Sequence, residues 1–162
     1  MNIRKALTAD AVGIAAVHIS SWQSAFAGII DADTMQRHSN RERITAMYQR
    51  SLENGETAFV CEAEGKLSGF CFAGKARGIA EEDLSELICI HVRPEEKHRG
   101  IGTALLQKAI AEAKAQGYGR MCLWVFRENV SARNFYEKHG FVYAGISDIR
   151  AGAEEWLYLQ NL

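Results

Sequence analysis

The sequence predicts a mixed α/β fold, in which helices cover both faces of a central mixed β-sheet of about seven strands. The spacing of apolar residues changes along the chain between the helical period and the patterns typical of strands. The run from Leu84 to Val92 is apolar at nearly every position, as expected for a central strand covered on both faces. With 162 residues, the chain is long enough for one well-packed domain and too short for two. We therefore predict a single domain over residues 1–162.

The N-terminal third is predicted to be mainly helical after a short strand at Asn2 to Lys5. A helix from about Thr8 to Ala27 has apolar residues at helical spacing, and Thr8 is of the type that caps helix N-termini. A shorter helix is expected over Asp31 to His38. Asn40 can cap a third helix, which runs to about Leu52 and ends at Asn54-Gly55.

Strands dominate the middle of the chain. Thr57 to Ala63 and Lys66 to Gly74 predict an antiparallel hairpin that is closed by the tight turn Glu64-Gly65. A loop over Ala76 to Asp83 then leads into the central strand, Leu84 to Val92.

Helices and strands alternate in the remainder. We predict a helix at Gly100 to Gln116, a strand at Arg120 to Phe126 and a helix at Val130 to His139. Strands at Phe141 to Ile149 and Glu154 to Leu159 follow, and the second is expected to close the sheet as an antiparallel strand. Its free edge could pair with a second copy of the chain, so a homodimer is possible.

The composition excludes several classes of protein. A formal net charge of −1 argues against a nucleic-acid binder with a broad basic surface. No stretch of about eighteen apolar residues is present, so we expect no membrane span. The N-terminal residues lack the apolar core of a signal peptide, which favours a cytoplasmic protein.

The four cysteines are interpreted as buried free thiols that act as small apolar side chains. Each stands alone in an apolar, strand-like run, with no Cys-x-x-Cys pair and no histidine at metal-ligand spacing. We therefore expect neither a disulfide nor a metal site. The four are Cys61, Cys71, Cys89 and Cys122.

The most informative segment contains a candidate anion site. An apolar strand runs into a basic turn with glycines, and that turn opens a helix. Free backbone N–H groups and the helix dipole converge at such a point, and neighbouring basic residues favour a phosphate or pyrophosphate. The Gly-Lys-Ser/Thr of a P-loop is missing, and Leu105 stands where a dinucleotide-binding fingerprint has its third glycine.

Two motifs in this segment resemble those of the GNAT superfamily of N-acetyltransferases. Lys97-His98-Arg99-Gly100-Ile101-Gly102, within Leu87 to Leu106, resembles the acyl-CoA-binding motif Arg/Gln-x-x-Gly-x-Gly/Ala. The segment from Asn129 to Phe141 resembles the second cofactor motif of the same family. Lys97 departs from the pattern, since lysine supplies charge without the planar fork of arginine. The order of predicted elements also resembles the GNAT fold from end to end.

The resemblance implies acetyl-CoA as the cofactor and assigns residues to it. The main chain of Ile90 and Val92 would hold the pantetheine arm between two splayed strands, and an amide near them would stabilise the oxyanion. Asn129 would bond the arm from the neighbouring strand. Backbone amides would cradle the pyrophosphate at Lys97, His98, Arg99, Gly100, Ile101, Gly102 and Thr103.

Candidate catalytic residues follow from the chemistry of acetyl transfer. Glu86 is our candidate general base and would also contact the acceptor, because partial burial at the start of an apolar strand would make it a stronger base. His91 is the competing base, although strand alternation points it away from the face of Ile90 and Val92 unless a bulge intervenes. Tyr136 would assist the departing thiolate, chiefly as a hydrogen-bond donor, because a thiol is more acidic than a phenol.

An aromatic stripe is the candidate acceptor site. His18, Trp22 and Phe26 recur at four-residue spacing on one helix face. A similar stretch occurs in one bacterial branch of the GNAT family near the acceptor entrance, which implies Trp22 and Phe26 as substrate-binding residues. A core stripe is an equally good interpretation. Acidic residues nearby could attract a cationic acceptor, or could simply be solvated: Asp31, Asp33, Glu81, Glu82 and Asp83.

The sequence therefore predicts an acetyl-CoA-dependent N-acetyltransferase. A primary amine of a small molecule or peptide would attack the thioester directly in a ternary complex, because neither motif contains a cysteine that could carry the acetyl group. One alternative is a module that binds acyl-CoA as a sensor without turnover. Another is an acetyltransferase for protein N-termini or lysines. The identity of the amine and the oligomeric state stay open.

Overall fold

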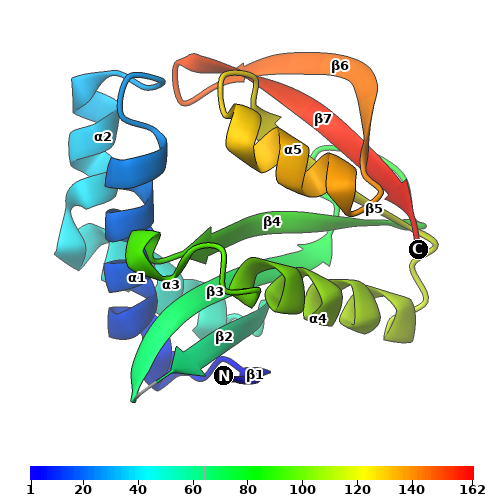
Figure 1. The fold of residues 1–162 in the computed structure, drawn as a ribbon. Helices are drawn as coiled ribbons and strands as arrows, with labels where there is room; N and C mark the ends of the chain where they lie inside the picture. Colours follow the sequence, from blue (N-terminus) through cyan, green and yellow to red (C-terminus); the bar gives the residue numbers. More distant parts are fainter. Residues whose placement is uncertain (64) are drawn as a thin grey trace.

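The computed structural model describes residues 1–63 and 65–162, and its centre is a seven-stranded sheet (Figure 1). The strand order is β1-β2-β3-β4-β5-β7-β6. All neighbours are antiparallel except β4 and β5, which run parallel. The strands are β1 (Asn2–Lys5), β2 (Thr57–Ala63), β3 (Lys66–Lys75), β4 (Leu84–Val92), β5 (Arg120–Phe126), β6 (Val142–Arg150) and β7 (Ala153–Asn161).

The helices lie close to the predicted ranges. Asp31 and Asn40 cap two of them, because their side-chain Oδ1 atoms accept hydrogen bonds from Thr34 N–H at 2.7 Å and Arg43 N–H at 2.9 Å. The predicted turn at Glu64-Gly65 includes Glu64, which lies outside the described residues. The helices are α1 (Ala11–Ala25), α2 (Ala32–Ser39), α3 (Arg41–Glu53), α4 (Ile101–Ala115) and α5 (Val130–Lys138).

The predicted cap at Thr8 is wrong. A short 3₁₀ turn, Thr8–Asp10, precedes α1, so the helix begins three residues later than expected. Asp10 accounts for this start. Its carboxylate accepts hydrogen bonds from the Leu7 N–H at 2.7 Å and from Arg4 at 2.7 and 2.9 Å, which tightens the chain into a turn before the helix.

Strand alternation divides the core between two faces of the sheet. We call the side covered by α1 and α3 the α1 face, and the side covered by α4 and α5 the α4 face (Figure 1). Val60, Phe70 and Phe72 pack on the α1 face, whereas Phe59 and Cys71 pack on the α4 face. The sheet is therefore covered on both sides, as predicted.

The last strand does not close the sheet, contrary to the prediction. β7 lies between β5 and β6 and is paired on both edges, so it has no free edge for a second copy of the chain. The edge strand is β6. The sequence could not show this. A last strand at the edge of the sheet and a last strand inserted between two others have the same apolar pattern.

A β-bulge in β4 sets the direction of its side chains. Cys89 pairs with Phe72 and Leu87 pairs with Ala73, which leaves Ile88 without a partner on β3. After the bulge the alternation is regular, so Ile90 and Val92 pack toward the α4 face and His91 points to the α1 face. The predicted opposite orientation of His91 is confirmed, because the bulge precedes it.

Replacing Leu105 tests the α4 side of the core. Leu105 is fully buried, and its Cδ1 lies 3.1 Å from where a Cβ on Gly69 would stand. We expect Leu105→Ala to lower the free energy of unfolding by about 2–5 kcal/mol, measured by urea denaturation. Val12→Ala, on the exposed side of α1, is the control and should change the free energy of unfolding by less than about 0.5 kcal/mol. Equal losses in both variants would contradict this description of the core.

Candidate functional site

The two central strands part after a short stretch of pairing. β4 and β5 pair at three positions, of which the last joins Glu86 to Cys122. Beyond that point β4 stays paired to β3, up to Val92, and β5 stays paired to β7, up to Phe126. The facing edges of β4 and β5 therefore present backbone N–H and C=O groups that do not pair with each other (Figure 1).

The basic turn follows β4 after a short 3₁₀ turn, Pro94–Glu96. Two residues in it have left-handed backbones, with φ values of +63° at His98 and +80° at Gly100. Gly100 is the N-cap of α4 and supplies no side-chain hydrogen bond to the first turn. Such a turn leads consecutive N–H groups toward one point and forms an anion-binding concavity at the positive end of the helix dipole.

Gly102 leaves room above this turn. A Cβ added there would lie 3.5 Å from Phe135 and 3.9 Å from Val92, which are ordinary contacts. Packing within the protein therefore does not require glycine at this position. Glycine would be required here if a ligand came close to the backbone.

Helix α5 is fastened to the start of α4 through His139. The His139 Nδ1–H donates to the carbonyl oxygen of Phe135 at 2.7 Å, and Thr103 Oγ1 lies 3.1 Å from Nε2. The Nδ1–H is thus committed to Phe135, and Nε2 faces the Thr103 hydroxyl. Asn129 caps α5, since its Oδ1 accepts from Ala132 N–H at 3.2 Å, and its amide nitrogen stays free to donate to a ligand.

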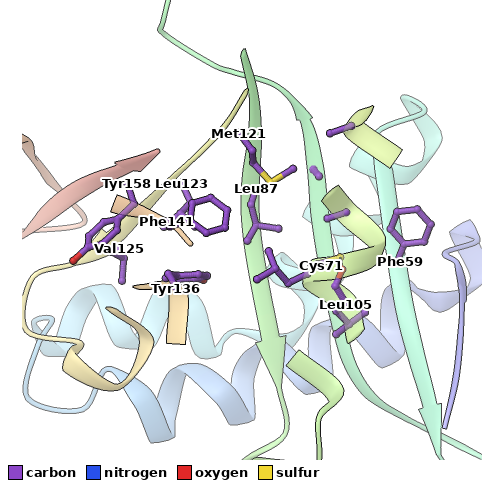
Figure 2. Packing of buried hydrophobic residues seen from close by; sticks show 14 of the residues in the cluster. Phe59, Cys71, Leu87, Leu105, Met121, Leu123, Val125, Tyr136, Phe141 and Tyr158 are labelled. Carbon is purple, nitrogen blue, oxygen red and sulfur yellow. Dashed lines mark hydrogen bonds between the residues drawn. The ribbon is translucent and has the colours of Figure 1, made fainter. Parts of the chain in front are cut away.

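Tyr136 lies beside the splayed part of β5 on the α4 face (Figure 2). Its ring is buried in the same cluster as Val125 and Phe141, and its centroid lies 5.9 Å from that of Phe141. Burial raises the pKa of Tyr136 above its ordinary value, so the phenol keeps its proton throughout the neutral range.

Glu86 sits at the point where β4 and β5 part, and its carboxylate is already fully engaged. Its side chain is 4% exposed and accepts three hydrogen bonds from Arg77, from the backbone N–H at 3.0 Å, Nε at 3.1 Å and Nη2 at 2.9 Å. Arg77 belongs to the loop before β4 and was not singled out in the sequence. A ligand that needs this carboxylate as its acceptor would therefore have to displace Arg77.

His91 belongs to a group of histidines beneath α1. Its Nδ1 lies 3.0 Å from Ser21 Oγ, and its ring centroid lies 5.3 Å from that of His18. His18 in turn lies 2.8 Å from the Tyr48 hydroxyl and 3.2 Å from His38. Burial lowers the pKa of His18 to about 2 and that of His91 to about 4, so both are neutral at pH 7. This grouping could not be predicted from the sequence, because it depends on how α1, α2, α3 and β4 pack together.

The aromatic stripe joins the core to the splayed strand. Trp22 stacks on His38 with centroids 3.6 Å apart and meets Phe26 edge-on at 4.8 Å. Phe26 reaches Phe126, at the end of β5, at 5.0 Å. The row therefore starts in the core at His18 and ends at the strand that parts from β4. Its buried part fits the core interpretation, and the binding of an acceptor by Trp22 and Phe26 stays a prediction.

The turn between β6 and β7 meets the start of α2 near this row. Ala151 and Gly152 have φ values of +48° and +77°, as in a type I′ hairpin turn. A Cβ on Gly152 would stand 3.1 Å from Asp31 Oδ2. Two loops from opposite ends of the chain are thus in close contact on this side of the sheet.

The acidic residues singled out in the sequence mostly have structural partners. Asp31 caps α2, Glu81 pairs with Arg120, and the Asp83 carboxylate accepts from Gly119 N–H at 2.6 Å. In the described residues, no group of three or more histidine, cysteine or acidic side chains is suited to hold a metal ion. None of the helices described is long and apolar enough to span a membrane.

The cysteines are free, and three of them are buried. Burial raises the pKa of Cys89 and Cys122 to about 12, and it also raises the pKa of Cys61 and Cys71. Thiols in this state are weak nucleophiles at neutral pH. This agrees with the prediction that they act as apolar side chains.

A cavity of about 320 Å³ lies beside β3 and β4. It opens between the α3–β2 turn, the end of β3 and the middle of β4, and Gly55, Gly74, Arg77 and Ile88 line it. None of its lining residues in the described chain belongs to β5. It is therefore on the β3 side of β4, away from the anion turn.

Comparison with known proteins decides the family. The model of the acetyltransferase (GNAT) family matches residues 19–141 of this chain. The chain belongs to the GNAT family. A spermidine N(1)-acetyltransferase of Thermoplasma acidophilum is 29% identical over 146 residues, which cover 87% of this chain and 88% of that protein.

Other GNAT proteins match over different lengths. An uncharacterized N-acetyltransferase of Methanocaldococcus jannaschii is 44% identical over 85 residues, but these span only 38% of that protein and 51% of this chain. The crystal structure of the PaiA N-acetyltransferase of Thermoplasma acidophilum in complex with coenzyme A superposes with a TM-score of 0.77 at 25% identity. That match covers 99% of this chain and 98% of the other.

The GNAT fold and acetyl-CoA as cofactor, inferred from two sequence motifs, are thus confirmed. The roles of individual residues remain predictions. Sequence reasoning missed the partners that the fold supplies, among them Arg77, Ser21, His38, Phe126 and His139. Only their types were visible in the sequence, and nothing in their spacing places them together.

The neutral state of His91 has a measurable consequence for stability. An unfolded histidine binds a proton with a pKa near 6.5, whereas folded His91 does so only near pH 4. Between these values the unfolded chain holds more protons, so stability falls as the pH falls. The free energy of unfolding should fall between pH 7 and pH 5 in both proteins. We expect the fall to be about 2 kcal/mol smaller in His91→Gln than in the wild type, measured by guanidinium unfolding. Equal losses in the two proteins would contradict a buried neutral His91.

Proposed function

We propose that this GNAT protein transfers the acetyl group of acetyl-CoA to a primary amine of a small molecule or peptide. The amine attacks the thioester directly in a ternary complex. One observation carries the proposal: the anion turn at the N-terminus of α4 adjoins the unpaired edges of β4 and β5. A diphosphate and an amide-bearing arm are the two parts of coenzyme A that such groups recognise.

The residues of the turn suit the diphosphate. Gly100 supplies no side-chain cap to the first turn of α4, and the left-handed backbone at His98 and Gly100 turns the N–H groups from His98 to Thr103 toward a common point. The Lys97 N–H donates to the Pro94 carbonyl oxygen at 3.3 Å, so Lys97 would contribute its charge rather than its amide. The unpaired edge of β4 at Ile90 and Val92 offers main-chain groups to the amides of the pantetheine arm, and the Asn129 amide offers a donor from the other side. A β4 amide near these residues would stabilise the oxyanion.

The chemistry requires a neutral amine and a departing thiolate. The amine nitrogen forms a bond to the carbonyl carbon, the C–S bond breaks, and the electron pair leaves with sulfur. Tyr136 suits the role of hydrogen-bond donor to the thiolate, because burial raises its pKa and disfavours loss of its proton. Full proton transfer from the phenol is uphill, since a thiol has a pKa near 8.5.

The acceptor is proposed to approach from the α1 face, along the row formed by Trp22, Phe26 and Phe126. Small amines are the acceptors named for similar proteins, including a spermidine N(1)-acetyltransferase and several mycothiol acetyltransferases. A sensor without turnover is the alternative, and thiol release distinguishes the two. The cytoplasmic location stays a prediction.

Charge reversal at the anion turn tests cofactor binding. We expect Gly102→Glu to abolish binding of acetyl-CoA and of dephospho-CoA in calorimetric titrations, because the new carboxylate would lie where the diphosphate is bound. Gly102→Ala is the control and should stay folded, since its Cβ makes only ordinary contacts. Undiminished binding to a folded Gly102→Glu variant would rule out the turn as the diphosphate site.

Removing the phenol tests the role of Tyr136. We expect Tyr136→Phe to lower kcat by about 10- to 100-fold, the factor that a hydrogen bond to a charged group supplies. The acetyl-CoA dissociation constant should stay within about twofold, because the ring and its packing remain. The measurement is thiol release at saturating acetyl-CoA. An unchanged kcat would remove Tyr136 from the reaction.

A further inference from the structure

The proposed reaction needs a group that takes a proton from the acceptor amine, and Glu86 is poorly suited to it. All three donors that Arg77 directs at Glu86 are within 3.1 Å. Deprotonating an amine through this carboxylate would require the pair to separate first. Another carboxylate on the same face of the sheet has no such partner.

That carboxylate is Glu155, in β7. Its Cα pairs with that of Phe126, at the end of the splayed part of β5, and with that of Asp148 on β6. The next residue, Trp156, packs toward α5 on the α4 face, with the Arg133 guanidinium 4.7 Å from its ring. Glu155 therefore points to the α1 face, where the aromatic row ends.

The pairing of Glu155 is weak for a carboxylate that is only 15% exposed. Its nearest cation is Arg150, whose Nε lies 3.7 Å from Oε2, beyond hydrogen-bond distance. No donor in residues 1–63 and 65–162 forms a hydrogen bond with it. A largely buried carboxylate without donors is costly, and an ammonium group would satisfy it.

The surroundings of Glu155 suit an amine with an apolar body. Trp124 lies on the same face of β5, with the Arg150 guanidinium 4.0 Å from its ring, and Phe126 adds a second ring beside Phe26. The indole N–H groups of Trp124 and Trp22 are buried and have no partner in the described part of the chain. Trp124 and Phe126 thus present aromatic surface on the face of the sheet to which Glu155 points.

We propose that Glu155 is the carboxylate that binds the acceptor's ammonium group and takes its proton. The inference rests on the proposed acetyl transfer and adds its acceptor site. It makes the preferred acceptor a cationic amine with an apolar or aromatic body, and it makes Glu86 a positioning residue that holds the Arg77 loop against the sheet.

The proton balance of the step is as follows. The ammonium gives one proton to the Glu155 carboxylate, and the neutral amine forms the C–N bond as the C–S bond breaks. The nitrogen then loses a second proton, which neutralises the thiolate to give the thiol of coenzyme A. Glu155 returns its proton to solvent, so one proton is released in each turnover.

The charges around Glu155 favour this role. Burial raises its pKa, Asp148 and Glu86 raise it further, and Arg150 opposes them. A base works best when its pKa is near the operating pH, so a raised value suits proton abstraction better than that of an exposed glutamate. The base must be ionised, so kcat/KM should fall as the pH falls through this pKa.

The test compares Glu155→Gln with Glu154→Gln. Glu154 is the neighbouring carboxylate on the same strand and pairs with Arg127 at 2.9 Å, away from the proposed site. Thiol release would be measured from pH 5 to 9 with 1,4-diaminobutane, spermidine and 2-phenylethylamine as probe amines. We expect Glu155→Gln to lower kcat/KM by about 10²-fold or more and to remove the acidic decline, at unchanged acetyl-CoA affinity. Glu154→Gln should behave as the wild type.

A second measurement does not depend on turnover. In protein with ¹³C-labelled glutamate carboxyls and bound coenzyme A, the Glu155 signal is assigned by its loss in Glu155→Gln. We expect its titration midpoint to lie above that of free glutamate and to move to lower pH when 1,4-diaminobutane is added. A midpoint that no probe amine moves, or a Glu155→Gln variant within threefold of the wild type, would overturn the proposal.

The two proposals fail in different ways. Failure to bind acetyl-CoA would defeat the acetyltransferase function. The pH titration of Glu155 could still be measured without coenzyme A, with and without the amine, and would report on the acceptor site. Binding of acetyl-CoA and turnover that Glu155→Gln leaves intact would keep the function and remove Glu155 from it. If Glu86→Gln instead abolished turnover without loss of stability, Glu86 would be the base.

Discussion

The structure depends on one backbone constraint: β4 and β5 pair at only three positions before they part. Each strand is held along its outer edge by an antiparallel neighbour, so the facing edges stay open without loss of the sheet. The basic turn leaves β4 at the open end and leads into α4, which brings the helix N-terminus to the same place. Two kinds of backbone donor, strand edge and helix start, thus converge on one ligand.

The two faces of the sheet carry different chemical groups where β4 and β5 part. Tyr136 and the anion turn lie toward the α4 face, and the aromatic row, His91 and Glu155 lie toward the α1 face. The bulge at Ile88 contributes to this division, because it fixes which side chains of β4 point to each face. Two substrates can therefore meet from opposite sides of the sheet, as direct transfer between them requires.

Sequence patterns predicted most of the fold and the identity of the cofactor, because those depend on local signals. The left-handed Gly100 and the cap at Asn40 are encoded by residues within a few positions of where they act. The insertion of β7 beside β5 was not predictable, since it depends on long-range pairing. The pairing of Glu86 with Arg77 was likewise hidden, as was the isolation of Glu155, because charge partners are set by where loops and strands meet.

The contact between the Ala151-Gly152 turn and Asp31 has a consequence for how this architecture diversifies. Both lie in loops, and neither belongs to the strands or the helix start that we propose as the coenzyme A site. Changes in their length or side chains would reshape the acceptor entrance and leave the sheet and the anion turn untouched. One scaffold can in this way acquire new amine substrates through a few loop substitutions while its energy-rich donor stays the same.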